Sequence, residues 1–196
     1  MLENIKGYEI ILVSHSPRRR ELLSRLGLEF TVEYSTVDES YPEGLDRYEI
    51  AMYLSHRKAF HPVSAMKMNN LIIAADTIVW SEGKVLGKPG SNSEARAMLD
   101  ELSGHLHYVV TGVTLRTSKI EKTFYAETEV LFGELSDVEK DYYVTTFQPF
   151  DKAGAYGIQE WIGMIGVKGI NGSFYNVMGL PVYKLYNELK NIPLCC

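Results

Sequence analysis

Apolar residues alternate along the chain between short β-branched runs and stretches with helical spacing, and polar turn residues separate them. The first apolar run, residues 8–13, predicts a strand. Ser16 and Pro17 follow it and predict the N-cap and first residue of a helix ending near Leu26, before Gly27. The same patterns predict further strands at 29–34, 71–79, 84–86, 107–116, 123–132 and 164–168, and helices at 46–66, 91–102, from 136 onward and through 185–189.

Three local signals refine this outline. Glu82-Gly83 predicts a hairpin turn that returns the chain through residues 84–86. Pro62 should break or kink the second helix near its end. Ser136 and Glu139 have the spacing of a capping box. Because hairpins are mixed with alternating helices and strands, we expect an α/β fold with a mixed twisted sheet flanked by helices.

Length and composition fit one compact domain over residues 1–196, or two intimate lobes, because 45% of the residues are hydrophobic and 23% charged. The formal net charge of −5 gives no bulk positive field, so general nucleic-acid binding is not expected and an RNA- or tRNA-binding module fits poorly. No apolar run approaches the roughly 20 residues that cross a bilayer, and no signal-like block opens the chain, so we expect a cytoplasmic protein without membrane contact. The only cysteines, Cys195 and Cys196, resemble a dispensable tail.

The strongest chemical signal lies where the first strand meets the first helix. Ser14, Ser16 and three consecutive arginines, residues 18–20, surround a predicted helix N-terminus. Backbone N–H groups and the helix dipole favour an anion there, and a guanidinium group can bind two phosphate oxygens at once. The alternative is a capped helix with a solvated basic face.

Asp76 is the second signal, since it places a carboxylate in a strand that is otherwise apolar. A buried charge needs a metal, an arginine or a catalytic role, unless turn N–H groups satisfy it. Lys58 could face solvent or a cleft. Gly87-Lys88-Pro89 fails the P-loop pattern, although Lys88 could still meet a phosphate as a point charge.

Weaker candidates are scattered along the chain. Asp38 and Glu39 follow the second predicted strand, and Asp151 precedes a glycine-rich stretch. The histidine pairs, His56 with His61 and His105 with His107, lack a third ligand and do not predict zinc.

Taken together, these residues resemble the Maf family of nucleoside triphosphate pyrophosphatases. The resemblance begins with Ser14-His15-Ser16-Pro17-Arg18-Arg19-Arg20-Glu21-Leu22-Leu23. It continues in order through Val37-Asp38-Glu39, Lys58-Ala59, Ala75-Asp76-Thr77, Leu86-Gly87-Lys88-Pro89, Leu102-Ser103-Gly104, Thr111-Gly112-Val113, the block from Asp151 to Gln159, and the block from Asn176 to Pro181. So many motifs in one order cover nearly the whole chain.

The resemblance implies a fold of two lobes around a central cleft, similar to inosine triphosphate pyrophosphatases. It implies hydrolysis of a nucleoside triphosphate to the monophosphate and pyrophosphate with a divalent cation, Mg²⁺ or Mn²⁺, and makes a homodimer plausible. Asp76 would be the proton acceptor, with Glu39 and Asp76 as metal ligands. The triphosphate clamp would comprise Ser14, Arg18, Arg19, Lys58 and Lys88.

Asp76-Thr77 and Ile158-Gln159 resemble the branch that acts on dTTP and UTP. A glutamine amide can both donate to O4 and accept from N3–H of uracil or thymine, so Arg18, Thr77 and Gln159 are the specificity candidates. Two positions depart from the family pattern: His15 stands where a small residue is usual, and Glu160 where glycine is common. The competing hypothesis is a nucleotide-binding regulator without turnover, because family members have been linked to septum formation.

Overall fold

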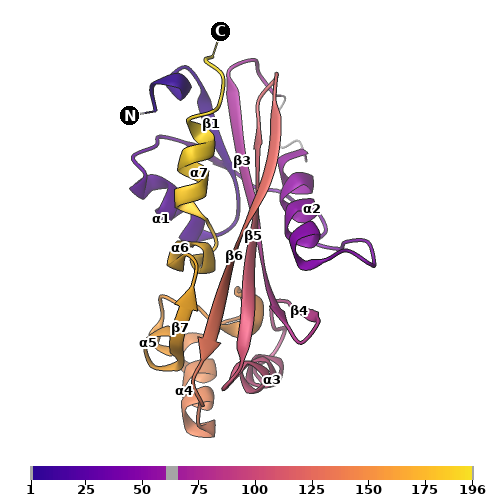
Figure 1. Ribbon diagram of the computed structural model, residues 1–196, viewed down its shortest axis with the longest axis vertical. Helices are drawn as coiled ribbons and strands as arrows, with labels where there is room; N and C mark the ends of the chain where they lie inside the picture. Colours follow the sequence, from indigo (N-terminus) through magenta and orange to yellow (C-terminus); the bar gives the residue numbers. More distant parts are fainter. Residues whose placement is uncertain (1, 61–65, 196) are drawn as a thin grey trace. The chain divides into compact units, whose positions relative to one another are not determined.

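The computed structural model describes residues 2–60 and 66–195 as a mixed α/β protein (Figure 1). Its strands are β1 (Glu9–Val13), β2 (Thr31–Glu33), β3 (Asn70–Ser81), β4 (Lys84–Leu86), β5 (Leu106–Arg116), β6 (Glu121–Phe132) and β7 (Val167–Asn171). Its α-helices are α1 (Pro17–Arg25), α2 (Arg47–Phe60), α3 (Asn92–Leu102), α4 (Asp137–Phe147), α5 (Trp161–Gly166), α6 (Phe174–Met178) and α7 (Val182–Leu189), joined by the short 3₁₀ helices η1 (Glu3–Ile5) and η2 (Ala153–Ala155).

The strands form one seven-stranded sheet in the order β2-β1-β3-β5-β6-β7, with β4 paired to β3. β1 is parallel to both β2 and β3, whereas β3–β4 and β6–β7 are antiparallel. The sheet is therefore mixed, which confirms the fold class predicted from the hairpin and the helix–strand alternation.

The chain divides into two compact units. Unit 1 comprises residues 1–76, 111–126 and 179–196, and unit 2 comprises residues 77–110 and 127–178. The chain passes from one unit to the other within β3, β5 and β6 and after Met178. The single domain over residues 1–196 and the cleft between two lobes stay predictions.

Unit 1 is built on β1, with β2 and β3 as its parallel neighbours. Ile11, Val13 and Ala74 on these strands pack against Ala59 of α2. α7 belongs to the same unit, and the Asn4 amide donates to the carbonyl oxygens of Leu189 and Ile192 at 2.8 Å each. The two ends of the described chain are thereby joined within unit 1.

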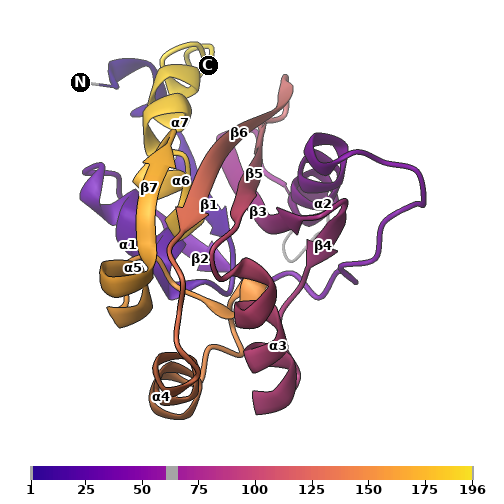
Figure 2. The same ribbon diagram turned by 60° about the horizontal axis from the view of Figure 1, so that its bottom comes forward.

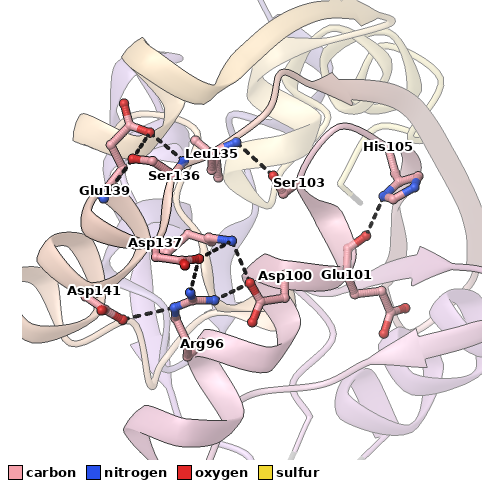
Figure 3. A network of polar contacts seen from close by, with 11 residues as sticks. Arg96, Asp100, Glu101, Ser103, His105, Leu135, Ser136, Asp137, Glu139 and Asp141 are labelled. Atoms are coloured by element: carbon pink, nitrogen blue, oxygen red, sulfur yellow. Dashed lines mark hydrogen bonds and ion pairs between the residues drawn. The ribbon is translucent and has the colours of Figure 1, made fainter.

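In unit 2, helices α3 and α4 lie side by side (Figure 2) and are joined by ion pairs. Arg96 of α3 contacts Asp137 at 2.6 Å and Asp141 at 2.9 Å, both on α4 (Figure 3). Lys140 of α4 returns to Asp100 of α3 at 2.6 Å. The capping box predicted at Ser136 is present at the start of α4.

Most predicted elements are present, and one prediction is partly wrong. Residues 164–166 of the strand predicted at 164–168 belong to helix α5, and β7 begins at Val167. The N–H groups of Gly163 and Met164 donate to the carbonyl oxygen of Glu160 and close a helical turn. A short apolar run does not distinguish helix from strand by itself. The helix predicted at 46–66 is described to Phe60, and the kink at Pro62 and the residue His61 lie outside the described residues.

No helix of the described chain has the length and apolar character that a membrane crossing requires.

Candidate functional site

The N-terminus of α1 has the capping expected from the sequence. Ser16 is the N-cap, and its side chain accepts a hydrogen bond from the Arg19 N–H at 3.4 Å. Ser14, which is buried, anchors the preceding loop: its N–H donates to Glu33 O at 3.0 Å, and its hydroxyl accepts from Ser16 N–H at 3.1 Å. Pro17 occupies the first helical position. The loop is thus fixed before any ligand binds, with the positive end of the helix dipole beside it.

Arg19 is held by a backbone carbonyl group from a distant part of the sequence. Its Nε donates to Gly179 O at 2.8 Å. Burial lowers the pKa of Arg19, while Asp76 and Glu39 nearby oppose that change and Arg18 adds to it. A guanidinium group stays protonated at neutral pH even so. Arg19 therefore brings a positive charge into the neighbourhood of both carboxylates, and Arg18 lies close to it.

Lys58, Glu39 and Asp76 form the centre of the site in unit 1. Lys58, in the last turn of α2, places its Nζ 2.8 Å from Glu39 Oε1 and also bonds Asp76 Oδ1. The Lys58 side chain is 13% exposed and that of Asp76 is 9% exposed. The sequence left open whether Lys58 faces solvent or a cleft, and in the structure its side chain lies away from solvent. The buried charge of Asp76 is compensated by this ammonium group, which differs from the partners expected from the sequence, namely a metal, an arginine or turn N–H groups.

Arg57 holds the loop that carries Glu39, a role that was not predicted from the sequence. Its Nη1 donates to Asp38 O at 3.0 Å and to Ser40 O at 2.9 Å, on either side of Glu39. Asp38 faces its own loop, since its carboxylate accepts from Ser40 N–H at 3.2 Å. The only signal in the sequence was the position of Arg57 next to Lys58.

His15, the first departure from the family pattern, packs against the segment that follows β2. Its ring stacks on Tyr34 with centroids 4.7 Å apart, and its Nε2 donates to Ser35 O at 3.1 Å. This contact ties the residue after Ser14 to the segment that leads toward Glu39.

The remaining predicted site residues belong to unit 2. Thr77 follows Asp76 in β3, Lys88 is exposed in the loop after β4, and Gln159 lies between η2 and α5. Gly154 N–H donates to Gly87 O at 3.0 Å, so the loop of Lys88 contacts the segment that leads to Gln159. Gly154 has φ 67°, and a Cβ there would lie 3.0 Å from a methyl group of Val79. Lys88 and Gln159 thus come from two segments in direct contact.

One polar atom of the Gln159 side chain is buried without a hydrogen-bond partner among the described residues. Among residues 2–60 and 66–195, no group hydrogen-bonds Gln159 Oε1, although this atom is buried. A buried amide oxygen without a partner costs free energy.

A divalent cation fits the donors of unit 1 only with help from a substrate. Within the described parts of the chain, no three His, Cys, Asp or Glu side chains come together as a metal site. Glu39 and Asp76 offer two carboxylates that share Lys58. Mg²⁺ is commonly held by one or two carboxylates plus the phosphates of a substrate, so this donor set suits it.

These features define a class of protein: a mixed α/β fold with a capped helix N-terminus, guanidinium groups and a lysine–carboxylate cluster, equipped to bind an oxyanion. Within that class, the chain belongs to the Maf family, because the family model described as "Maf-like protein" matches residues 9–192. This confirms the family inferred from the motifs.

Close relatives span nearly the full chain. A protein of Phocaeicola vulgatus is 54% identical over 98% of this chain and 100% of its own length, and one of Bacteroides thetaiotaomicron is 55% identical with the same coverage. Both are called dTTP/UTP pyrophosphatase. Among solved structures, the Ham1 protein of Staphylococcus aureus matches 63% of this chain and 71% of its own, with 16% identity and a TM-score of 0.42.

Proposed function

We propose that this protein is a nucleoside triphosphate pyrophosphatase that hydrolyses dTTP and UTP to the monophosphate and pyrophosphate. The observation that carries the proposal is the cluster of Asp76, Lys58 and Glu39, near Arg19 and on the unit that also holds the N-terminus of α1. The names of the relatives that span nearly the whole chain support the same reaction and the same bases.

In this mechanism, cationic groups bind the triphosphate. Arg18, Arg19 and the first turn of α1 bind phosphate oxygens together with the Ser14 hydroxyl, and the ammonium groups of Lys58 and Lys88 add point charges. Lys58 can exchange a carboxylate for a phosphate oxygen, because its flexible stem lets the ammonium group turn.

Asp76 is the proton acceptor. Its carboxylate takes a proton from the water that attacks the α-phosphorus; the new P–O bond forms as the bond to the bridging oxygen breaks, and pyrophosphate leaves. Glu39 and Asp76 would hold the divalent cation, Mg²⁺ or Mn²⁺, which when bound neutralises charge on the phosphates. Arg57 keeps the Glu39 carboxylate in place, because it holds the loop on either side of this residue.

Base preference rests on Gln159, with Arg18 and Thr77 as further contributors. The Gln159 amide can accept from N3–H with the buried Oε1 that lacks a partner among the described residues, and donate to O4 with Nε2.

The first test is pyrophosphate release from a panel of standard and modified triphosphates with Mg²⁺, on the wild type and on Asp76→Asn. We expect release from dTTP and UTP, and a loss of about 10²–10⁴-fold in kcat for Asp76→Asn because the proton acceptor is removed. Asp141→Asn is the matched control, because Asp141 contacts Arg96 in unit 2.

Near wild-type turnover by Asp76→Asn would contradict the assigned role of this carboxylate. Binding of UTP without pyrophosphate release under any metal would favour the nucleotide-binding regulator.

A further inference from the structure

The turn that carries Gln159 is tightly packed. Glu160 N–H donates to Gly157 O at 2.9 Å and closes the turn. The Gln159 Nε2 lies 2.8 Å from where a Cβ on Gly157 would stand, so the amide packs directly over the glycine backbone. On the other side, a Cβ on Gly163 of α5 would lie closer than 3.0 Å to Ile158 O, so the backbones touch. The position of the amide therefore depends on the exact path of this turn.

Glu160 anchors the turn through its carboxylate. The Tyr143 hydroxyl of α4 donates to Oε2, and the Lys152 ammonium group lies 3.0 Å from Oε1. The side chain of Lys152 is 8% exposed and that of Glu160 is 21% exposed, so water screens this pair little. Both carboxylate oxygens of Glu160 are engaged by groups from other segments.

Tyr143 joins both ends of the turn. Its oxygen accepts from Gly157 N–H at 3.1 Å while its hydroxyl hydrogen goes to Glu160. Burial, followed by the hydrogen bond and charge of Glu160, raises the pKa of Tyr143. The phenol thus stays protonated and remains the donor in this contact.

The orientation of a glutamine amide decides between uracil and cytosine. Uracil presents an acceptor, O4, beside the N3–H donor, whereas cytosine presents the N4–H₂ donor beside the acceptor N3. An amide turned by 180° exchanges its oxygen and nitrogen and would match cytosine equally well. A glutamine that selects uracil or thymine must therefore be prevented from turning.

We propose that Glu160 is a positioning residue for base selection: held by Tyr143 and Lys152, it fixes the turn 157–160 and so keeps the Gln159 amide in the orientation that accepts N3–H. This inference rests on the proposed function, in which Gln159 contacts the base. Glu160 itself does not touch the substrate and acts through Gln159.

The test compares uridine with cytidine triphosphates on the wild type and Glu160→Gln, which keeps the side-chain size and removes its charge. Two readouts are used: kcat and KM for UTP and CTP, and the Kd of their non-hydrolysable α,β-methylene analogues. We expect the preference for UTP over CTP to fall about tenfold, through KM and Kd, with kcat for UTP changed by no more than about twofold.

Glu139→Gln is the matched control. Glu139 lies in the same unit, and its carboxylate accepts from the Ser136 N–H and hydroxyl at 2.7 Å each in the capping box of α4. The same substitution there costs stability and should leave base preference unchanged. Tyr143→Phe removes the other end of the contact and should lower the preference for UTP over CTP in the same way. It replaces Glu160→Gln in the test if that variant folds poorly.

A double variant separates action through Gln159 from any other route. In the Gln159→Ala background, Glu160→Gln should not change base preference further. An equal change in both backgrounds, or an unchanged preference in Glu160→Gln and Tyr143→Phe, would overturn the proposal. A wild type that binds the UTP analogue in preference to the CTP analogue without releasing pyrophosphate would refute the proposed function alone, whereas a wild type without preference would refute the positioning role.

Discussion

His107 is a fully buried histidine in unit 2, enclosed by aromatic rings. Its Nε2 lies 2.8 Å from the Tyr156 hydroxyl oxygen, and its ring meets Phe132 edge-on with centroids 5.2 Å apart. Burial lowers the pKa of His107 to about 4 from a usual value near 6.5, because the low-dielectric surroundings disfavour the charged ring. The folded protein therefore keeps this ring neutral in mildly acidic solution.

This histidine should make the protein less stable in acid. Below pH 6.5 the unfolded chain binds a proton that the folded chain does not take up until near pH 4, so stability falls as the pH falls across that window. We expect the loss of unfolding free energy between pH 7 and pH 4.5 to be smaller in His107→Gln by about 2 kcal/mol, measured by urea denaturation. His105→Gln, at an exposed site, should show the wild-type loss. An equal loss of unfolding free energy in all three proteins would contradict the prediction.

Single residues could be predicted from the sequence where their chemistry conflicts with their surroundings. Asp76 stands out because it interrupts an apolar strand, and Ser16 and Pro17 because they mark a helix start. The arginine that holds the Glu39 loop and the carboxylate that holds the Gln159 turn could not be found in this way. Their partners are carbonyl oxygens and side chains brought together only by the fold, and no spacing along the chain encodes them.

At the scale of elements, Gly112 allows β5 to approach α2 within unit 1. A Cβ at this position would lie closer than 3.0 Å to the backbone of Ala51 and Met52, where only backbone movement could relieve the clash. The motif Thr111-Gly112-Val113 that supports the family resemblance therefore contains a packing requirement.

Gly112→Ala should lower the free energy of unfolding by about 3 kcal/mol or more, because the added methyl group forces the helix and strand apart. Gly169→Ala in β7 is the control, since nothing lies within 4 Å of a Cβ there. It should be neutral or slightly stabilising. Equal midpoints of urea denaturation for the two variants would refute this account of Gly112.

Element boundaries followed from the sequence wherever a cap or turn marked them. Ser91 and Ser136 start α3 and α4 as N-caps, and the hairpin at Glu82-Gly83 has positive φ at both residues. The strand predicted at 164–168 is wrong at residues 164–166, because its apolar residues carry no period and the helical turn there depends on the carbonyl oxygen of Glu160. Local chemistry thus predicted ends of elements better than their type in short apolar runs.

At the scale of the whole molecule, three strands run through both units. Neither unit is a continuous piece of chain, so we expect the molecule to unfold in one cooperative transition. The homodimer implied by the family resemblance stays a prediction.

The two tryptophans provide the measurement, because Trp80 and Trp161 both lie in unit 2. Urea denaturation followed by tryptophan fluorescence should coincide with that followed by far-ultraviolet circular dichroism, which reports on both units. Gly112→Ala, in unit 1, should shift the fluorescence transition as far as the dichroism transition. Separate transitions, or a fluorescence midpoint unmoved by Gly112→Ala, would show that the units unfold independently.

The joined chain ends have a consequence for synthesis on the ribosome. Unit 2 is fully translated once Met178 has been added, but unit 1 needs residues 179–196. The carbonyl of Gly179 that fixes Arg19, and those of Leu189 and Ile192 that receive the Asn4 amide, are all made after unit 2. Although α1 is made early, its anchored form needs residues that are made after unit 2, so we expect a nascent chain that stops at Met178 to lack the contact that fixes Arg19.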